Sequence, residues 1–207
     1  MSEITPTRSA YLELREEREG MQEGYRFLDE KRLVLAAEIL QQLKQYEQLM
    51  SRFRIAYNEA ARSLKRAIAR HGLIGMEHYP PTSDSIDLAT TSRSVLGVAI
   101  QKTSAEHSHA QSPETLLASP EGEQCRERFT QLLPISAELA SITGNLERLR
   151  EEYQRTSRRA RALEDVILPE IDDDLQRIDS ALAELEKEEA VRVKMIHGYD
   201  GGLMGSS

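Results

Sequence analysis

Three groups of side chains have types and spacing that could do chemistry. His107 and His109 in the segment HSH could ligate a metal, Cys125 could act as a nucleophile, and Asp172–Asp174 form a run of three carboxylates. A closed zinc site needs four ligands, and nothing near the histidines supplies the others. No suitable base accompanies the cysteine, and consecutive residues fan out around a helix instead of converging. We therefore expect solvated histidines and aspartates, an incidental cysteine, no bound metal or cofactor, and no catalytic activity.

A run of arginines, in the segment RTSRRARAL, is the most basic stretch of the chain. Arg155, Arg158 and Arg159 lie at spacings that form one basic face on a helix. Two interpretations stay open: the arginines pair with Glu151 and Glu152 at helical spacing, or they form a contact surface for an acidic partner. Nucleic acid is not expected, because no aromatic residues interleave the run and the chain is acidic overall.

The composition bounds the fold class. The chain has 207 residues and a net charge of −8, with only 5% aromatic residues, 11 glycines and 7 prolines. Such a chain favours helix and argues against a sandwich or barrel. The lone cysteine excludes an intramolecular disulfide, no apolar run is long enough for a membrane span, and the polar start MSEITPTR is unlike a signal peptide. We expect a cytoplasmic protein.

The first part of the chain has a long helical pattern. Apolar residues recur at steps of three and four over about 6–70, which predicts the seam of a coiled coil. Thr5 is the expected N-cap with Pro6 as the first helical residue, and Gly72 is the expected end of the helix. One apolar series repeats every eleven residues, at Leu35, Tyr46, Tyr57 and Ile68.

A connector and a second helical pattern follow. The run Val95–Ile100, which contains Gly97, predicts a short hairpin or a bulged strand. Ser119 is the expected cap of the next helix, with Pro120 at its first position, and this helix should stop near His197. The expected parts are an N-terminal shaft helix (1–72), a connector with a short β segment (73–119), a C-terminal shaft helix (120–197) and a flexible tail (198–207).

Two long helices joined by a connector must run antiparallel if they pair, since each seam alone is too narrow to hold a helix. The sequence predicts an all-α fold: a long antiparallel two-helix coiled coil whose short connector contains a small β-hairpin-like element. From the residues alone, such a protein could be a coiled-coil scaffold or adaptor. A helical arm that binds RNA is a further class, which the acidic charge disfavours.

The two ends and the middle of the chain resemble one known family. The segments TPTRSAYLELREE and LDEKRLVL resemble the N-terminal signature of the D subunit of V-type and archaeal A-type rotary ATPases. The segment RRARALEDVILPEIDDDLQRIDSALAELEKEEAVRVKMIH resembles the C-terminal signature of that family, and SRSVLGVAI resembles its short β segment. The resemblance covers most of the chain, with the segments in the right order.

The resemblance implies a central rotor shaft that is not itself catalytic and binds no nucleotide. Such a shaft couples ATP hydrolysis or synthesis in a catalytic hexamer to rotation of a membrane ring that translocates protons or sodium ions. The implied partners are the catalytic and noncatalytic nucleotide-binding subunits, the small F subunit, and the central-stalk adaptor that leads to the ring. The protein would be cytoplasmic and peripheral to the membrane within the complex. The alternative is a non-rotary coiled-coil scaffold.

The resemblance also suggests roles for particular residues. Both chain termini would lie inside the hexamer, and six residues would face its bearing: Thr7, Arg8, Leu12, Arg192, Lys194 and Met195. Proline inside a helix removes a backbone donor and bends the helix. Pro169 would therefore kink the second helix, and the kink either makes the shaft eccentric or is simply tolerated beside the neighbouring helix.

Overall fold

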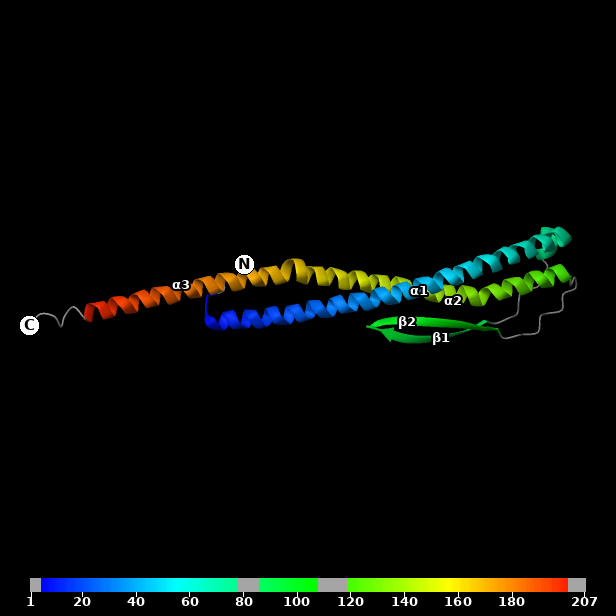
Figure 1. The fold of residues 1–207 in the computed structure, drawn as a ribbon. Helices are drawn as coiled ribbons and strands as arrows, with labels where there is room; N and C mark the ends of the chain where they lie inside the picture. Colours follow the sequence, from blue (N-terminus) through cyan, green and yellow to red (C-terminus); the bar gives the residue numbers. More distant parts are fainter. Residues whose placement is uncertain (1–4, 78–85, 108–118, 201–207) are drawn as a thin grey trace, which may run out of the picture. The chain divides into compact units, whose positions relative to one another are not determined.

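The computed structural model describes residues 5–77, 86–107 and 119–200. The elements in chain order are α1 (Arg8–Glu77), β1 (Ile86–Val95), β2 (Val98–His107), α2 (Pro120–Ala162), the π-helix η1 (Leu163–Ile167) and α3 (Leu168–Asp200) (Figure 1). They form two compact units: unit 1 contains Met1–Arg32 and Arg155–Ser207, and unit 2 contains Leu33–Gln154. Helices pair in both units, and the only sheet among the described residues is a two-stranded hairpin, which confirms the predicted all-α fold class.

Capping residues set where the helices begin. The Thr7 hydroxyl accepts a hydrogen bond from the Ala10 N–H at 3.2 Å, and the Thr7 carbonyl accepts one from the Tyr11 N–H. Thr7 is therefore the N-cap of α1, and the expectation of Thr5 is corrected: the segment TPT offers two possible caps, and only Thr7 lies three residues before a helical N–H that its side chain reaches. Ser119 caps α2 as predicted, accepting from the Gly122 N–H at 3.1 Å.

The ends of the helices extend past the expected positions. Gly72 has φ 71°, in the left-handed region that glycine adopts easily, and it interrupts the helical backbone of α1. The chain is helical again after this break and α1 ends at Glu77. The final helix, α3, continues to Asp200, past the expected end near His197.

Unit 1 is an antiparallel pair formed by the start of α1 and the segment that runs from α2 through η1 into α3. Arg8 pairs with Glu186, Arg18 pairs with Asp172, and Gly24 faces Leu163. The residue numbers of the partners on η1 and α3 thus decrease as those on α1 increase, which makes the pair antiparallel. Ile171 and Ile178 are the buried aliphatic residues of α3 in this pair, seven residues apart as a coiled-coil seam requires.

Unit 2 pairs the rest of α1 with α2, and the hairpin packs against the pair. Arg128 bonds Glu59 and Arg70 bonds Glu121, both at 3.1 Å, so these helices are antiparallel as well. The core of the unit is a cluster of aliphatic residues from α1, β2 and α2: Leu35, Val98, Ile100 and Leu149. Leu35 and Leu149 are fully buried.

The hairpin replaces the short strand expected at Val95–Ile100. Its two ten-residue strands pair antiparallel without interruption from Ile86↔His107 to Val95↔Val98, so the expected run spans the turn. Leu96 and Gly97 form that two-residue turn, and both have positive φ, as a type I′ turn requires. The hairpin alternative is confirmed, with longer strands than the apolar pattern indicated because most of their residues are polar.

The buried stripe of α1 differs from the predicted eleven-residue series. Its buried members are Leu35, Gln42, Leu49, Ala60, Ser63 and Ala67. Tyr57, which the series placed in the core, is 51% exposed. Hydropathy overlooks small and amide side chains, yet they occupy places where helices approach closely.

Candidate functional site

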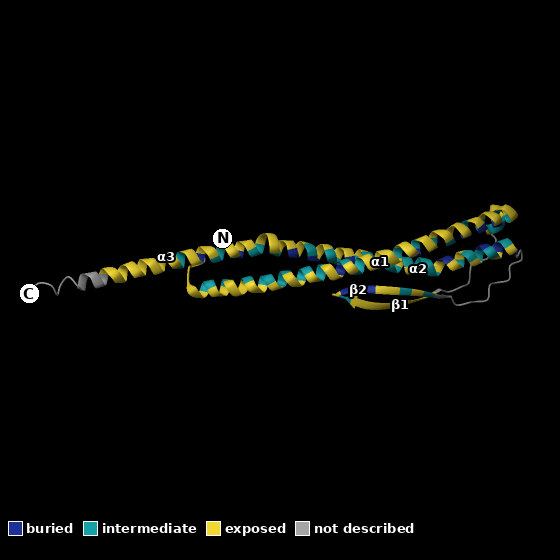
Figure 2. Ribbon diagram, in the orientation of Figure 1, coloured by how far each residue is buried: buried dark blue, intermediate teal, exposed yellow. Residues whose placement is uncertain are grey.

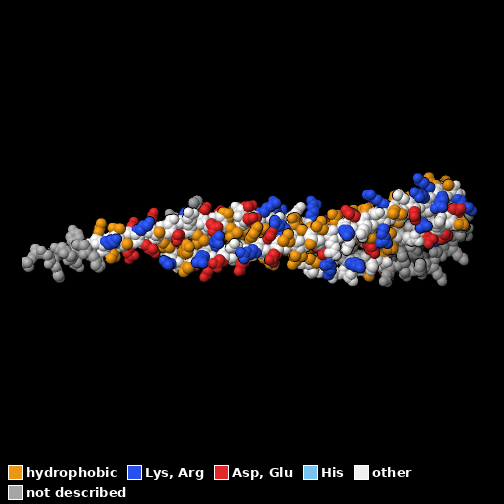
Figure 3. All heavy atoms as spheres, in the orientation of Figure 1, with side chains coloured by type: hydrophobic (Ala, Val, Ile, Leu, Met, Phe, Trp, Pro, Cys, Tyr) orange, Lys and Arg blue, Asp and Glu red, His pale blue; other side chains and the backbone are white. Residues whose placement is uncertain are grey.

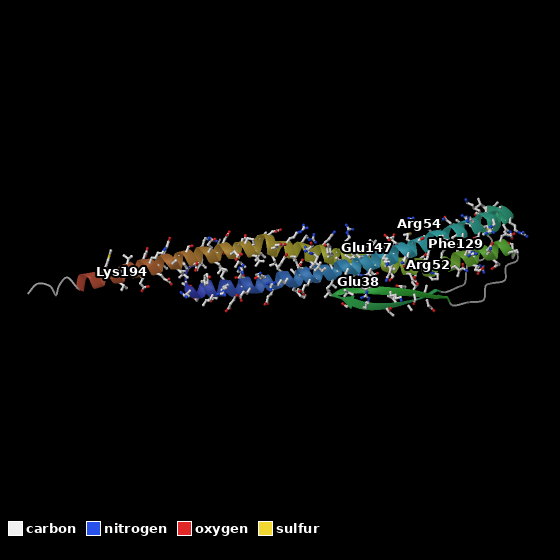
Figure 4. All side chains as sticks on the ribbon, viewed as in Figure 1. Glu38, Arg52, Arg54, Phe129, Glu147 and Lys194 are labelled. Carbon is white, nitrogen blue, oxygen red and sulfur yellow. The ribbon has the colours of Figure 1, made fainter. Side chains whose placement is uncertain are left out.

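The last turns of α3 continue past the start of α1, the helix with which α3 pairs in unit 1. Arg8, the first residue of α1, pairs with Glu186, and α3 continues past that point. Every residue of 183–195 is exposed (Figure 2). Lys194 lies on this segment, beyond the start of α1 (Figure 4).

The exposed apolar side chains of this segment extend over more than half of the helix circumference. About half of the side chain of Leu185, Val191 and Val193 is exposed, and Met195 is 67% exposed. At about 100° per residue these four positions span an arc of about 200°. A single packing helix would cover only one stripe of such a segment. An arrangement of this kind can make shallow contacts on more than one side.

The six residues expected to face a bearing lie at this end of unit 1, but they do not form one cluster. Thr7 and Arg8 are exposed at the start of α1, where Thr7 caps the helix. Leu12 is half exposed on α1. Arg192 and Lys194 lie six and eight residues past the partner of Arg8, about 9–12 Å further along α3 at 1.5 Å per residue.

The basic face lies near the C-terminal end of α2. Arg155, Arg158 and Arg159 are all exposed, and Lys and Arg side chains project from this region of the surface (Figure 3). Within the described part of the chain these arginines make no ion pair, and neither Glu151 nor Glu152 is their partner. The basic face therefore offers free guanidinium groups to an acidic surface.

A π-turn lies directly before Pro169. The backbone N–H of Leu168 bonds the carbonyl of Leu163, five residues back, and η1 covers Leu163–Ile167. Proline has no N–H and its ring clashes with the carbonyl four residues earlier in a regular helix. A wider turn at this place relieves that clash, which sequence reasoning missed because a π-turn has no compositional signal.

Tyr25 of α1 faces the π-turn. Partial burial raises the pKa of Tyr25, and the adjacent carboxylate of Glu164, which accepts a hydrogen bond from the phenol, raises it further. Gly24, the preceding residue, lies against Leu163, with 3.9 Å from its missing Cβ to the leucine methyl. Helix α1 therefore contacts the π-turn through a small residue and a hydrogen bond.

Side chains of α2 hold the hairpin in unit 2. Asn145, only 1% exposed, accepts from the Gln101 N–H at 2.8 Å and donates to the Gln101 carbonyl at 2.7 Å. Arg148 donates to the Ala99 carbonyl, and Ser141 donates to that of Gln101. On the other side, Arg93 of β1 bonds Glu38 of α1 at 2.5 Å, and Glu38 lies beside the hairpin (Figure 4).

A polar cleft of about 730 Å³ lies between the hairpin and the two helices of unit 2. Amide side chains dominate its lining, among them Gln41, Gln42, Gln45 and Gln48. The Gln42 amide donates to Glu38, and its carbonyl oxygen has no partner among the described residues. Amides of this kind bond polypeptide or water, and they supply neither an acid–base pair nor a nucleophile.

Among the described residues, those first considered for chemistry do not form a site. Cys125 is buried on α2. Asp172 and Asp174 pair with Arg18 and Arg177, and Asp172 and Asp173 are exposed to solvent as expected. The side chains of His107 and His109 lie outside the described residues. Among the described side chains no three carboxylate, imidazole or thiol groups converge as metal ligands, and no described helix has the length and apolar content of a membrane span.

Comparisons with known proteins match nearly the whole chain. Residues 10–198 match the family of the ATP synthase D subunit. The D subunit of the V-type ATP synthase of Anaeromyxobacter sp. (strain K) is 31% identical, over 94% of this chain and 95% of that protein.

Two further proteins are similar at lower identity. The D subunit of the V-type ATP synthase of Thermotoga neapolitana is 27% identical, over 93% of this chain and 96% of that protein. The D subunit of the A-type ATP synthase of Methanopyrus kandleri is 28% identical, over 95% of this chain and 86% of that protein. The match thus includes both ends of unit 1 and the hairpin of unit 2.

Proposed function

The chain belongs to the family of ATP synthase D subunits, and on that premise we propose that it is the central rotor shaft of a V/A-type ATPase or ATP synthase that translocates protons or sodium ions. As a shaft it couples ATP hydrolysis or synthesis in a catalytic hexamer to rotation of a membrane ring. It binds no nucleotide, and its contribution to the reaction is mechanical. It is cytoplasmic and peripheral to the membrane as part of the complex.

The observation that carries the proposal is the exposed end of α3, residues 183–195. Its apolar residues point in several directions and alternate with charged ones such as Arg192 and Lys194. A helix that exposes apolar groups over more than half of its circumference needs contacts on more than one side to cover them. Shallow, mixed contacts of this kind support a bearing, because no single orientation gains a deep interface that would stop rotation.

The bearing residues follow from this arrangement. Arg192, Lys194 and Met195 contact the inner surface of the hexamer from α3. Thr7, Arg8 and Leu12 do so from the start of α1. Exposed ion pairs such as that of Arg8 with Glu186 can break and form again with another partner at low cost. Surface pairs contribute only about 0–1 kcal/mol to stability.

The basic face gives the shaft a second contact with the hexamer. Arg155, Arg158 and Arg159 are exposed and without ion pairs in the described part of the chain, which supports the contact-surface interpretation over internal pairing. Acidic segments of the catalytic or noncatalytic subunits meet these guanidinium groups in turn. The interaction is electrostatic and weakens as salt rises.

The remaining partners lie outside the hexamer. The small F subunit and the central-stalk adaptor that leads to the membrane ring bind unit 2, which contains the connector and its hairpin. The Pro169 region contributes eccentricity: the wide turn of η1 changes the path of the helix where α1 faces it, so the shaft presents different surfaces to the three catalytic units.

A rotation assay tests the proposal. The hexamer is fixed to a surface, and a probe is attached to this chain through Ser104→Cys, an exposed position of β2; Cys125 is buried and does not compete for the label. We expect ATP to drive unidirectional rotation with three dwell positions per turn. The unlabelled wild-type chain in the same assembly is the control for ATPase activity.

The rival function gives a different result. A non-rotary scaffold would bind partners without ATPase activity, or would bind the hexamer without turning. Native mass spectrometry of the tagged chain purified from its own cells separates the two: a multi-subunit ATPase with one copy of the chain supports the shaft, and a homodimer or partners without ATPase activity contradict it.

A further inference from the structure

The two edges of the hairpin differ in how their backbone groups are paired. Pairs flanking a two-residue turn are hydrogen-bonded, and the next pairs along the ladder point their N–H and C=O groups outward, in alternation. On β2 the outward residues include Ala99 and Gln101, and α2 bonds them: Arg148 to the first carbonyl, and Asn145 and Ser141 to the second residue. The edge formed by β2 is therefore closed over these residues by side chains of its own chain.

The described residues leave the edge formed by β1 open over the same length. By the register, the outward residues of β1 are Leu88, Thr90, Ser92 and Ser94. Their outward N–H and C=O groups have no partner among the residues that the structure describes. All four side chains are exposed, and three of them are the short hydroxyl side chains of serine or threonine.

The described residues give this edge little of the usual protection. Proteins blunt free strand edges with proline, charged residues (lysine above all), β-bulges or covering segments. The strand IDLATTSRSV contains neither proline nor lysine, and of its two charged residues, Asp87 and Arg93, the second is paired with Glu38 of α1. Its pairing with β2 continues through ten residues without a bulge. A long and regular edge of this kind is suited to strand addition.

The hairpin is also held firmly enough to receive a strand. Val98 and Ile100 are buried in the core of unit 2, and Arg93 bonds Glu38. Because the edge is ordered before binding, the hairpin loses little conformational entropy when the partner forms hydrogen bonds with it.

We propose that the outer edge of β1, from Leu88 to Ser94, binds an extended segment of another subunit of the ATP synthase, which adds to the hairpin as a third strand. The recognition chemistry is a row of alternating main-chain donors and acceptors, which only another extended backbone matches over this length. The inference rests on the proposed function, because the partner is drawn from that assembly.

Residue-resolved amide exchange tests the proposal in the intact complex. The isolated chain and the assembled ATP synthase are compared under the same conditions. We expect the outward amides of Leu88, Thr90, Ser92 and Ser94 to exchange at least tenfold more slowly in the complex, while the amides already inside the ladder, such as Arg93 and Ile100, change little. Outward amides that exchange equally fast in both states, or that are already slow in the isolated chain, overturn the proposal.

Matched variants test whether the backbone groups are responsible. Ser92→Pro removes one outward donor without removing a bond of the hairpin, and Ser92→Lys places an edge-blocking charge; Ser92→Thr is the control. Both blocking variants should weaken incorporation into the complex at least tenfold, and the control should stay within twofold. The ladder amides of Arg93 and Ile100 check that the hairpin is intact. Normal incorporation of both blocking variants contradicts strand addition.

A photo-crosslinking residue at Ser92 identifies the occupant. A crosslink to another subunit supports the proposal, and a crosslink to a second copy of this chain or within the chain overturns it. The outcomes separate the two levels of inference. If no ATPase assembles with the chain, the proposed function fails. If the complex assembles and rotates while the edge stays unpaired, only the strand addition fails.

Discussion

Asn145 bonds both the N–H and the C=O of Gln101 while it is itself almost completely buried. Nothing in the sequence distinguishes it from any other asparagine on a helix. It joins α2 to β2 by a pair of hydrogen bonds that repeats the pattern of a neighbouring strand. A residue that carries out this role is found only when the partner backbone is seen.

Asn145→Ala should therefore destabilise unit 2. It leaves the N–H and part of the acceptor capacity of Gln101 without a partner, which costs about 1–3 kcal/mol of unfolding free energy. Urea unfolding measures the loss. Ser141→Ala is the control, since the Gln101 carbonyl keeps its bond from Asn145 and the expected cost is about 0.5–1 kcal/mol. Equal losses in the two variants would show that the paired bond has no special role.

Tyr25 should make stability sensitive to alkaline pH. Partial burial and the neighbouring Glu164 raise its pKa in the folded chain above the value of about 10 in the unfolded chain. The unfolded state therefore loses this proton first, so the contribution of Tyr25 is complete below about pH 10 and is lost as pH rises through the folded pKa.

Thermal unfolding between about pH 8 and 11 checks this prediction. Tyr25→Phe cannot ionise and should show a shallower alkaline decline than the wild type. Tyr57→Phe is the control, because Tyr57 is an exposed tyrosine of the same helix that keeps its ring contact with Phe53 as phenylalanine. The prediction is wrong if the Tyr25 variant declines as steeply as the wild type.

At the scale of elements, the π-turn explains how a long helix contains Pro169. The five-residue turn of η1 sits immediately before Leu168 and the proline, with α1 against it. A π-turn has one residue more than an α-turn and shifts the phase of the residues that follow. Ile171 and Ile178 follow the π-turn, and with the shifted phase both side chains are buried.

Pro169→Ala tests the origin and the role of this turn. Alanine restores the missing donor, and if the proline maintains the wide turn, the free energy of unfolding should rise by about 1–3 kcal/mol, as measured in urea. If the turn also makes the shaft eccentric, torque in the rotation assay should fall while the hexamer still binds. Pro134→Ala, in α2 without a π-turn beside it, is the control. Unchanged torque in the Pro169 variant would leave the proline as a tolerated irregularity.

At the scale of the whole molecule, stability and function separate along the chain. In the described part of the chain, the ion pairs and buried residues of α3 that hold unit 1 together lie at or before Glu186, and residues 187–195 are all exposed. Removal of residues 187–207 should therefore change the unfolding free energy by less than about 1 kcal/mol.

The same truncation should weaken binding to the hexamer at least tenfold and reduce coupled rotation. Surface binding kinetics with the immobilised hexamer measure the first effect, and the rotation assay measures the second. A chain shortened only by residues 201–207 is the control. A truncated chain that binds and rotates like the full chain would exclude this end of α3 as the bearing.

The predictability of this protein varied with the kind of interaction. Ser119 and Pro120 were identified because their capping chemistry is local, and the cap of α1 was misplaced by two residues because two threonines satisfy the same local rule. Tyr57 was misplaced because apolar periodicity does not tell which of two adjacent stripes faces a partner. The bearing residues and the basic face stay predictions, since their partners lie in other chains.

The sequence by itself determined the helices, their antiparallel pairing, the hairpin connection and the family, because these depend on periodicity, caps and contiguous motifs. Only the tertiary structure decided which side chains close one hairpin edge and leave the other open. It also decided that a π-turn accommodates Pro169 and that Gln42 and Ser63 occupy the buried stripe. These features depend on groups that folding brings together from distant segments. A sequence pattern does not show which donor will bond which acceptor.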